Sequence, residues 1–173
     1  MKRLLSLFTI LFIAVAVFAY DFKVNGIYYN KLSDSNTCEV THKYSYNEDG
    51  YGWEVLIPSS VTYNGTTYIV TGIGSSAFSS SGSSIRNVII PSSVTTIGSH
   101  AFDGCTYITD INIPSSVTEI GAYAFQGTAW YKNQSDDMIY AGKVAYEYKG
   151  LMPENTSIII KDGTKGIGDQ AFY

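Results

Sequence analysis

Residues 85–107 read IRNVIIPSSVTTIGSHAFDGCTY, and the residues from Ile108 to Thr128 read ITDINIPSSVTEIGAYAFQGT. The two stretches are near copies at an offset of 23 residues without a gap. The shared residues are Ile85, Val88, Ile90, Pro91, Val94, Ile97, Gly98, Ala101 and Phe102 in one copy and Ile108, Ile111, Ile113, Pro114, Val117, Ile120, Gly121, Ala124 and Phe125 in the other. A fixed period of about 20 to 50 residues is typical of repeat architectures, so the fold follows from this unit.

Weaker copies flank this pair. The upstream copy is interrupted by an insertion, Tyr63–Val70, and its matching residues are Val55, Ile57, Pro58, Ser59, Ser60, Val61, Ile73, Gly74, Ala77 and Phe78. The downstream copy lies 47 residues after its predecessor and keeps Ile158, Ile160, Ile167, Gly168, Ala171 and Phe172. That interval holds two periods, which indicates one altered repeat between them.

The unit itself predicts a short strand followed by a return. Val88 and Ile90 alternate with Asn87 and Ile89, so one pair faces inward and the other outward. Proline ends the strand because it cannot donate a ladder hydrogen bond, and Ser-Ser favours a turn. Val-x-x-Ile-Gly then returns along the opposite side of the coil, with a glycine such as Gly98 at a bend that a side chain would block. One coil buries too little surface to stand alone, so we expect a solenoid of stacked coils with a parallel sheet on one side.

The string IPSSVTTIGSHAFDGC resembles the BspA-like subclass of leucine-rich repeats, in which Pro, Ile-Gly and Ala-Phe recur in fixed register. The resemblance covers about residues 53–128 and 156–173. It implies a leucine-rich-repeat horseshoe, often secreted or on bacterial surfaces, and some members are adhesins or surface antigens that bind host matrix proteins. The insertions and the small number of repeats depart from the family pattern.

The first 19 residues, MKRLLSLFTILFIAVAVFA, predict a cleaved signal peptide. Lys2 and Arg3 precede an apolar run of about 15 residues, shorter than the roughly 20 of a membrane span. Val17 and Ala19 suit a signal-peptidase site before Tyr20. Cleavage removes the two basic residues and lowers the formal net charge from −4 to −6. We therefore expect a secreted or cell-surface protein with no membrane span after cleavage.

Five segments follow from these patterns. They are the signal peptide (1–19), an N-terminal β cap (20–52), leucine-rich repeats (53–128) whose first copy carries a hairpin insertion (63–70), a β-hairpin insertion or degenerate repeat (129–155), and a final, apparently truncated repeat (156–173). Asn25-Gly26 and Asn64-Gly65 each separate alternating runs, which is a strong signal for a two-residue hairpin. The tyrosines concentrated in the hairpins either lock cross-strand pairs or form an aromatic recognition surface.

Composition excludes several classes of function. Charged residues make up 15%, against about 25% in a typical globular chain, and 15 tyrosines with 16 glycines favour strands and turns. The negative net charge, without a basic stripe, argues against nucleic-acid binding.

Few residues suggest chemistry. His42 and His100 lack a nucleophile partner in any recognisable motif, and His100 occupies a variable, solvent-facing slot of the repeat. Cys105 falls where other copies carry Ser81 or Thr128, so we expect it and Cys38 to be unpaired and buried, although the sequence leaves a disulfide open. Asp136-Asp137 lacks calcium-loop spacing. We expect no enzyme, no metal and no cofactor.

The expected function is adhesion to an extracellular protein or glycan through the exposed strand face. Its outward positions are Asn87, Ile89, Asp110, Asn112 and Ile159. The alternative is a structural spacer or self-assembly unit of a larger surface protein.

The final copy motivates one more expectation. Ala171-Phe172 is followed by Tyr173 alone, so no further strand covers Phe172. Because solenoids close their ends with caps, we expect either a truncated repeat array or end-to-end self-association through this end.

Overall fold

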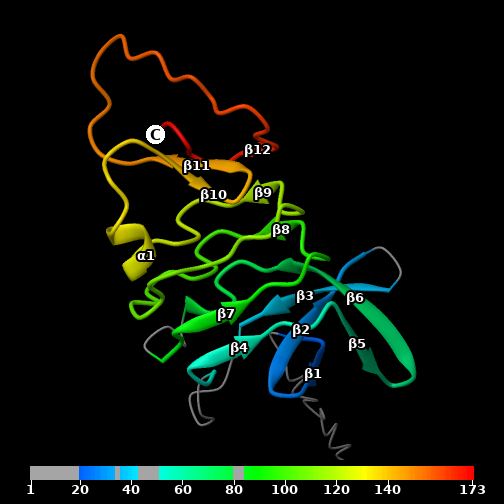
Figure 1. The fold of residues 1–173 in the computed structure, drawn as a ribbon. Coiled ribbons are helices and arrows are strands. Elements are labelled where there is room, and N and C mark those ends of the chain that lie inside the picture. Colours follow the sequence, from blue (N-terminus) through cyan, green and yellow to red (C-terminus); the bar gives the residue numbers. More distant parts are fainter. Residues whose placement is uncertain (1–19, 34–35, 43–50, 80–83) are drawn as a thin grey trace, which may run out of the picture.

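The structure, a computed structural model, describes residues 20–33, 36–42, 51–79 and 84–173 (Figure 1). The predicted signal peptide lies outside these residues. The described elements are β1 (Phe22–Val24), β2 (Ile27–Lys31), β3 (Thr37–Thr41), β4 (Glu54–Leu56), β5 (Ser60–Tyr63), β6 (Thr66–Ile73), β7 (Asn87–Ile89), β8 (Thr96–Ile97), β9 (Glu119–Ile120), α1 (Ala129–Lys132), β10 (Met138–Ala141), β11 (Val144–Tyr148) and β12 (Gly166–Ile167).

The N-terminal strands form hairpins, as the sequence predicted. β1 pairs antiparallel with β2 across Asn25-Gly26, and β5 pairs with β6 across Asn64-Gly65. All four turn residues have positive φ, between 48° and 83°, as the two central residues of a type I′ hairpin turn require. The tyrosines pack rather than line an open surface: Phe22 stacks on Tyr63 at 4.8 Å between ring centroids. The packing interpretation is therefore confirmed for these hairpins.

One sheet joins the cap to the repeats. Its path is β1-β2-β3-β6-β8-β9, and β5 pairs β6 at its side. From β3 onward the pairing is parallel, with Val40, Ile73, Ile97 and Ile120 opposite one another in register. Each repeat thus adds a short strand to the edge left by the one before, and Figure 1 shows these strands rising in chain order from the cap. The fold is mainly β with parallel strands.

The position of the parallel sheet differs from the expectation. The longer ladder uses the Ile-Gly arm of each repeat, whereas on the Ile-x-Ile-Pro side, within the described residues, only β4 and β7 pair. Residues 110–112, expected to be a strand, carry no strand assignment. Their alternation persists, because Ile111 and Ile113 are buried while Asp110 and Asn112 are exposed. Alternation fixes which way side chains face, but a strand also needs a neighbour at pairing distance.

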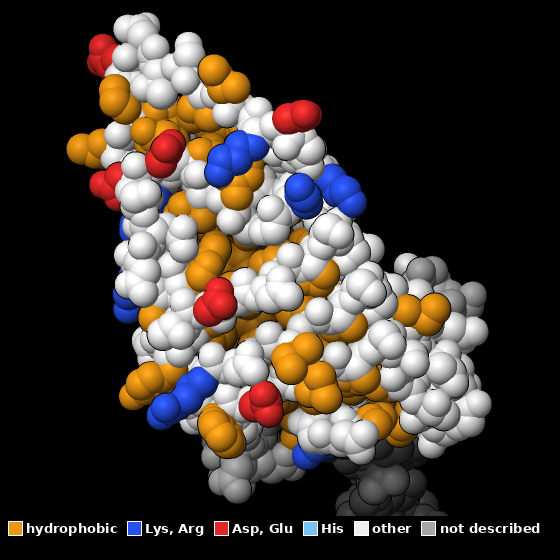
Figure 2. Space-filling view, in the orientation of Figure 1, with side chains coloured by type: hydrophobic (Ala, Val, Ile, Leu, Met, Phe, Trp, Pro, Cys, Tyr) orange, Lys and Arg blue, Asp and Glu red, His pale blue; other side chains and the backbone are white. Residues whose placement is uncertain are grey.

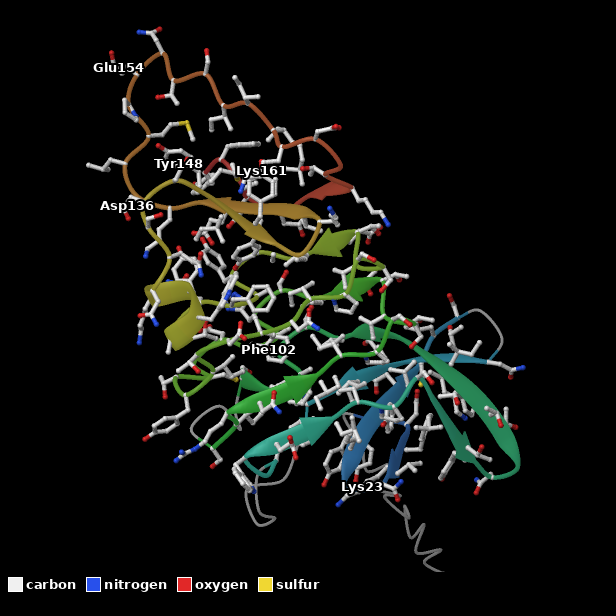
Figure 3. All side chains as sticks on the ribbon, viewed as in Figure 1. Lys23, Phe102, Asp136, Tyr148, Glu154 and Lys161 are labelled. Carbon is white, nitrogen blue, oxygen red and sulfur yellow. The ribbon has the colours of Figure 1, made fainter. Side chains whose placement is uncertain are left out.

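The core is a column of aromatic rings between two walls of aliphatic side chains. Phe78, Phe102 and Phe125 stack nearly parallel, with centroid distances of 5.1 and 5.6 Å. All three are fully buried, and Figure 3 places Phe102 among the side chains between coils. Cys105 and Thr128 are also fully buried, which confirms that their shared repeat position is a tight inward site.

The repeat glycines are required by close approach between coils. A Cβ on Gly98 would lie 2.5 Å from the backbone nitrogen of Ser75, and one on Gly121 would lie 2.4 Å from that of Ser99. Neither glycine has positive φ. The left-handed residue comes two positions later, at His100 and Tyr123. The expected bend is therefore present, but the glycine is not required by its dihedral angles. It is required because the backbones of neighbouring coils approach too closely for a side chain.

Residues 129–150 continue the stack in altered form. Trp130, in α1, packs edge-on against Phe125 at 5.1 Å, and Tyr131 donates a hydrogen bond to the Glu147 carboxylate. The β10–β11 hairpin follows, and β11 pairs parallel with β12 of the last repeat. Tyr146 contacts Phe125 edge-on, where another coil would supply a phenylalanine. The segment boundaries given above stay predictions.

Candidate functional site

The expected binding residues lie on the Ile-x-Ile-Pro side of the stack. All five are exposed: Asn87, Ile89, Asp110, Asn112 and Ile159. Val88 and Ile90 between them are buried, because successive side chains of an extended segment point to opposite faces. The repeat pattern therefore predicted their orientation correctly.

A shallow hollow of about 330 Å³ brings four of the five together. Asn87 and Ile89 line it from β7, and Asp110 and Asn112 line it from the next coil. Ile159 lies apart from them, in a separate hollow of about 220 Å³ beside Tyr140 and Lys161. The last coil contacts the third coil near Ile120, where the Asp169 amide donates a hydrogen bond to the Ile120 carbonyl, but Ile159 itself does not join the hollow at Asp110.

Neighbouring positions enlarge this face beyond the expected residues. In the β4–β7 ladder Leu56 pairs with Ile89, and the Asn87 side-chain amide donates a hydrogen bond to the Glu54 carboxylate at 2.9 Å. Leu56 is 63% exposed and the adjacent Trp53 is 73% exposed. The alternation around Val55 and Ile57 carries the same signal as the other copies and could have identified Leu56.

The face mixes apolar, polar and charged groups. Arg86 lies over the Tyr107 ring, 5.2 Å from its centroid, and it lines the hollow with Asp110. We use the name strand face for the exposed group Trp53, Glu54, Leu56, Arg86, Asn87, Ile89, Tyr107, Asp110 and Asn112. Figure 2 shows hydrophobic side chains interspersed with isolated acidic and basic ones over the β4–β7 region. Such a mixture suits a neutral or mixed ligand better than a polyanion.

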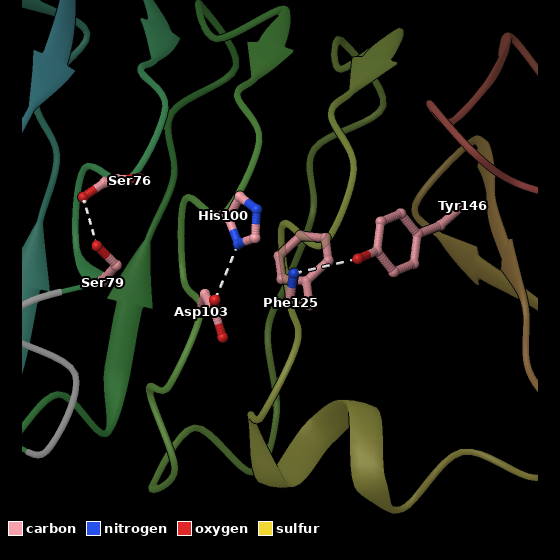
Figure 4. A network of polar contacts seen from close by, with 6 residues as sticks. All are labelled: Ser76, Ser79, His100, Asp103, Phe125 and Tyr146. Carbon is pink, nitrogen blue, oxygen red and sulfur yellow. Dashed lines mark hydrogen bonds and ion pairs between the residues drawn. The ribbon is translucent and has the colours of Figure 1, made fainter.

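The groups that could perform chemistry lie apart from this hollow. His100 Nδ1 is 2.9 Å from the Asp103 carboxylate, and both side chains are partly exposed to solvent (Figure 4). Among the described residues, no three or more His, Cys, Asp and Glu side chains could hold one metal ion. In that part of the chain, no helix is long and apolar enough to cross a membrane.

Both thiols are free and fully buried, as the sequence analysis favoured. Burial raises the pKa of Cys38 to about 11 and that of Cys105 to about 12, since the apolar surroundings disfavour a thiolate. The thiols are therefore protonated core groups rather than nucleophiles.

The stacked parallel strands and repeating buried Ile and Phe define a leucine-rich-repeat protein, and residues 71–173 match the profile described as BspA type leucine rich repeat region (6 copies). The chain belongs to this family. None of the curated proteins matches the chain at a significant level.

Solved structures agree with this fold. The chain resembles a leucine-rich repeat protein from Bacteroides ovatus, with 29% identity and a TM-score of 0.58 over 88% of this chain and 38% of that one. It also resembles a leucine-rich repeat protein from Bacteroides capillosus, with 30% identity and a TM-score of 0.52 over 60% of this chain and 72% of that one. A leucine rich cell surface protein from Faecalibacterium prausnitzii shares 33% identity over 61% of this chain and 27% of that one, with a TM-score of 0.49.

Proposed function

We propose that this protein is a secreted or cell-surface binding module that adheres to host or extracellular protein or glycan ligands through the strand face. The observation that carries the proposal is the exposure of Trp53, Leu56 and Ile89 beside the hollow at Asp110. Tryptophan is enriched among the residues that dominate binding energy at interfaces, and the exposed Leu56 and Ile89 add apolar area next to it. Catalysis is not part of the proposal.

The architecture and location belong to the same proposal. We infer that the coils form a solenoid of the leucine-rich-repeat horseshoe type, with an N-terminal β cap and hairpin insertions. Its support is the shared register of Ile73, Ile97 and Ile120 along one ladder. The predicted signal peptide supports export, and the family membership supports a binding role over an enzymatic one.

Binding to purified extracellular-matrix proteins and to a glycan array tests the proposal. The double variant Ile89→Ser with Asp110→Lys should reduce capture of any bound ligand by about tenfold or more, the equivalent of about 1.4 kcal/mol. The matched control makes the same changes away from the strand face, at Ile159→Ser with Asp162→Lys, and should bind as wild type. Equal loss in both variants, or no capture from either panel, would contradict the proposal.

A second candidate function is self-association through the last coil. Phe172 is 47% exposed and Ile167 55% exposed, where the equivalent Phe125 and Ile120 are almost fully covered. An apolar face of this kind packs against a further coil of chain or against another molecule. Sedimentation of the purified protein tests the second possibility: a concentration-dependent dimer that Phe172→Ser abolishes would support it, and a monomer at every concentration would refute it.

A further inference from the structure

A second groove crosses the other side of the coils, over the outer surface of the large sheet. It encloses about 570 Å³ and reaches from Asn30 and Glu39 in the cap, past Thr96 and Glu119, to Asp169 in the last coil. In Figure 1 these residues belong to neighbouring strands of the stack and to the coil after β12. The groove therefore spans the whole described array rather than a single repeat.

The strand register aligns its polar side chains in one row. Asn30 lies opposite Glu39, Glu39 opposite Gly72, Gly72 opposite Thr96, and Thr96 opposite Glu119. The adjacent positions Ile73, Ile97 and Ile120 are buried, so this row faces outward. A Cβ on Gly72 would lie 2.9 Å from the Thr96 hydroxyl oxygen and 3.3 Å from the Glu39 Cβ, so the side chains of Thr96 and Glu39 approach each other over this glycine.

Carboxylates dominate the charged lining of the groove. Glu39, Glu119 and Asp169 line it, and among the described residues its lining also holds His42 but no Lys or Arg. In the same part of the chain, none of the three carboxylates forms a salt bridge with a Lys or Arg. Burial raises the pKa of Glu39, against the lowering effect of its hydrogen bond with Asn30, so this carboxylate is held in the sheet without a compensating cation.

The spacing of the carboxylates excludes a single bound ion and suits an extended ligand. The described acids do not converge on a metal position. Glu39 and Glu119 are three strands apart, which corresponds to about 14 Å at about 4.8 Å per strand. Residues four apart in an extended peptide are separated by about 13 Å, so two basic side chains at that spacing reach both carboxylates.

We propose that this groove binds an extended basic segment of a partner protein, with Lys or Arg side chains four residues apart against Glu39 and Glu119. Asp169 takes a further cation at the end of the groove, and Thr96 and Ser99 offer hydroxyl groups to the peptide backbone. The inference rests on the proposed binding function. It adds a second binding face to that function and specifies the chemistry of the ligand.

Fluorescence anisotropy with labelled peptides tests the proposal on the purified protein. Arg-Ser-Ser-Ser-Arg should bind about three- to tenfold more tightly than Arg-Arg-Ser-Ser-Ser, which has the same composition, and Glu-Ser-Ser-Ser-Glu should not bind. The affinity should fall as NaCl rises from about 50 to about 500 mM, because salt screens exposed charges. Equal affinity for the two basic peptides would overturn the proposed spacing. Displacement of the bound peptide by Ca²⁺ alone, at a concentration equal to that of the peptide, would overturn the proposal and indicate an ion site instead.

Charge reversal within the groove provides the matched comparison. Glu119→Lys should weaken binding of the spaced peptide by about tenfold, whereas Asp110→Lys changes the net charge equally on the strand face and should leave the affinity within about twofold. An equal loss in both variants would show a net-charge effect and overturn the groove. The strand-face variant Ile89→Ser with Asp110→Lys separates the two proposals, since it should lose matrix or glycan binding and keep peptide binding.

Discussion

The third coil (108–128) and the last coil (156–173) carry the same Ile-Gly-x-x-Ala-Phe motif, but they differ in what covers it. Phe125 is fully buried between Phe102 on one side and Trp130 and Tyr146 on the other. Phe172 is 47% exposed. The isoleucine and the phenylalanine of the motif are thus core in one coil and exposed in the other, whereas Ala124 and Ala171 are buried in both. Burial of the large side chains therefore comes from the neighbouring coil.

The backbone shows that the motif itself is intact in the last coil. Gly121 donates to the Ile97 carbonyl at 2.8 Å, and Gly168 donates to the Ala145 carbonyl at the same distance. Tyr123 and Gln170 have nearly the same positive φ, 59° and 62°. The last coil therefore adopts the repeat conformation although its Ile167 and Phe172 are less covered than their equivalents, as expected where stability is a sum of contacts between neighbouring coils.

The largest effect is expected for truncating an interior ring. Phe102→Ala removes a fully buried ring that contacts Phe78 and Phe125, and it should lower the free energy of unfolding by about 3 to 5 kcal/mol. Chemical denaturation followed by tyrosine and tryptophan fluorescence measures the loss. A loss below about 1 kcal/mol would show that the ring column does not hold the coils together.

The second-largest effect is expected for a methyl group added where the backbones of two coils meet. In Gly98→Ala the new Cβ meets the backbone of Gly74 and Ser75, which cannot rotate away, so we expect a loss of about 2 kcal/mol or more in the free energy of unfolding. Gly104→Ala is the control: its surroundings are open, and only its φ of +76° opposes the change, at about 1 to 2 kcal/mol. A smaller loss at Gly98 than at Gly104, in the same denaturation experiment, would refute the close-contact explanation.

Thiol reactivity distinguishes the two regions without altering the core. Cys38 and Cys105 should not react with an aromatic disulfide reagent in the native protein at pH 8, since both are buried and their pKa values are raised well above that pH. Both should react once the protein is unfolded. A thiol placed in the last coil by Phe172→Cys should react in the native state, and native reactivity of the wild-type protein would contradict the packing described here.

The smallest effect is expected at the end of the stack. Phe172→Ala removes a ring that is already half exposed, so the free energy of unfolding should fall by less than about 1 kcal/mol. The comparison with Phe102→Ala is internal, because residue type and motif position are the same. A loss as large as that at Phe102 would mean that the last coil is covered in solution, for example by a second molecule.

Much of the fold followed from the sequence because the repeat carries it directly. The period predicted the stacking and the buried Phe column, and Asn-Gly pairs predicted both hairpin turns. The side of the coil with the longer ladder was not predicted, since the alternation at residues 108–113 is as clear as that at 85–90 but does not reveal which segments approach closely enough to pair. The outward residues of the hollow followed from the same alternation.

Other parts of the candidate sites could not be read from the repeat. Ile159 was assigned to the strand face by its position in the repeat, but it lines a separate hollow beside Tyr140 and Lys161. Glu39 gave no signal because it lies in the cap, and only the pairing of β3 with β6 brings it beside Gly72 and Thr96.

Native-state hydrogen exchange at two equivalent amides tests the central claim most directly. Gly121 and Gly168 are both buried and donate corresponding ladder bonds, but Gly121 lies beside the buried Ile120 and Gly168 beside the exposed Ile167. If neighbour contacts supply the stability, the Gly121 amide should exchange only through global unfolding, and the Gly168 amide should exchange at least about 100-fold faster after correction for intrinsic rates. Equal protection of the two amides in the monomeric protein would contradict the account.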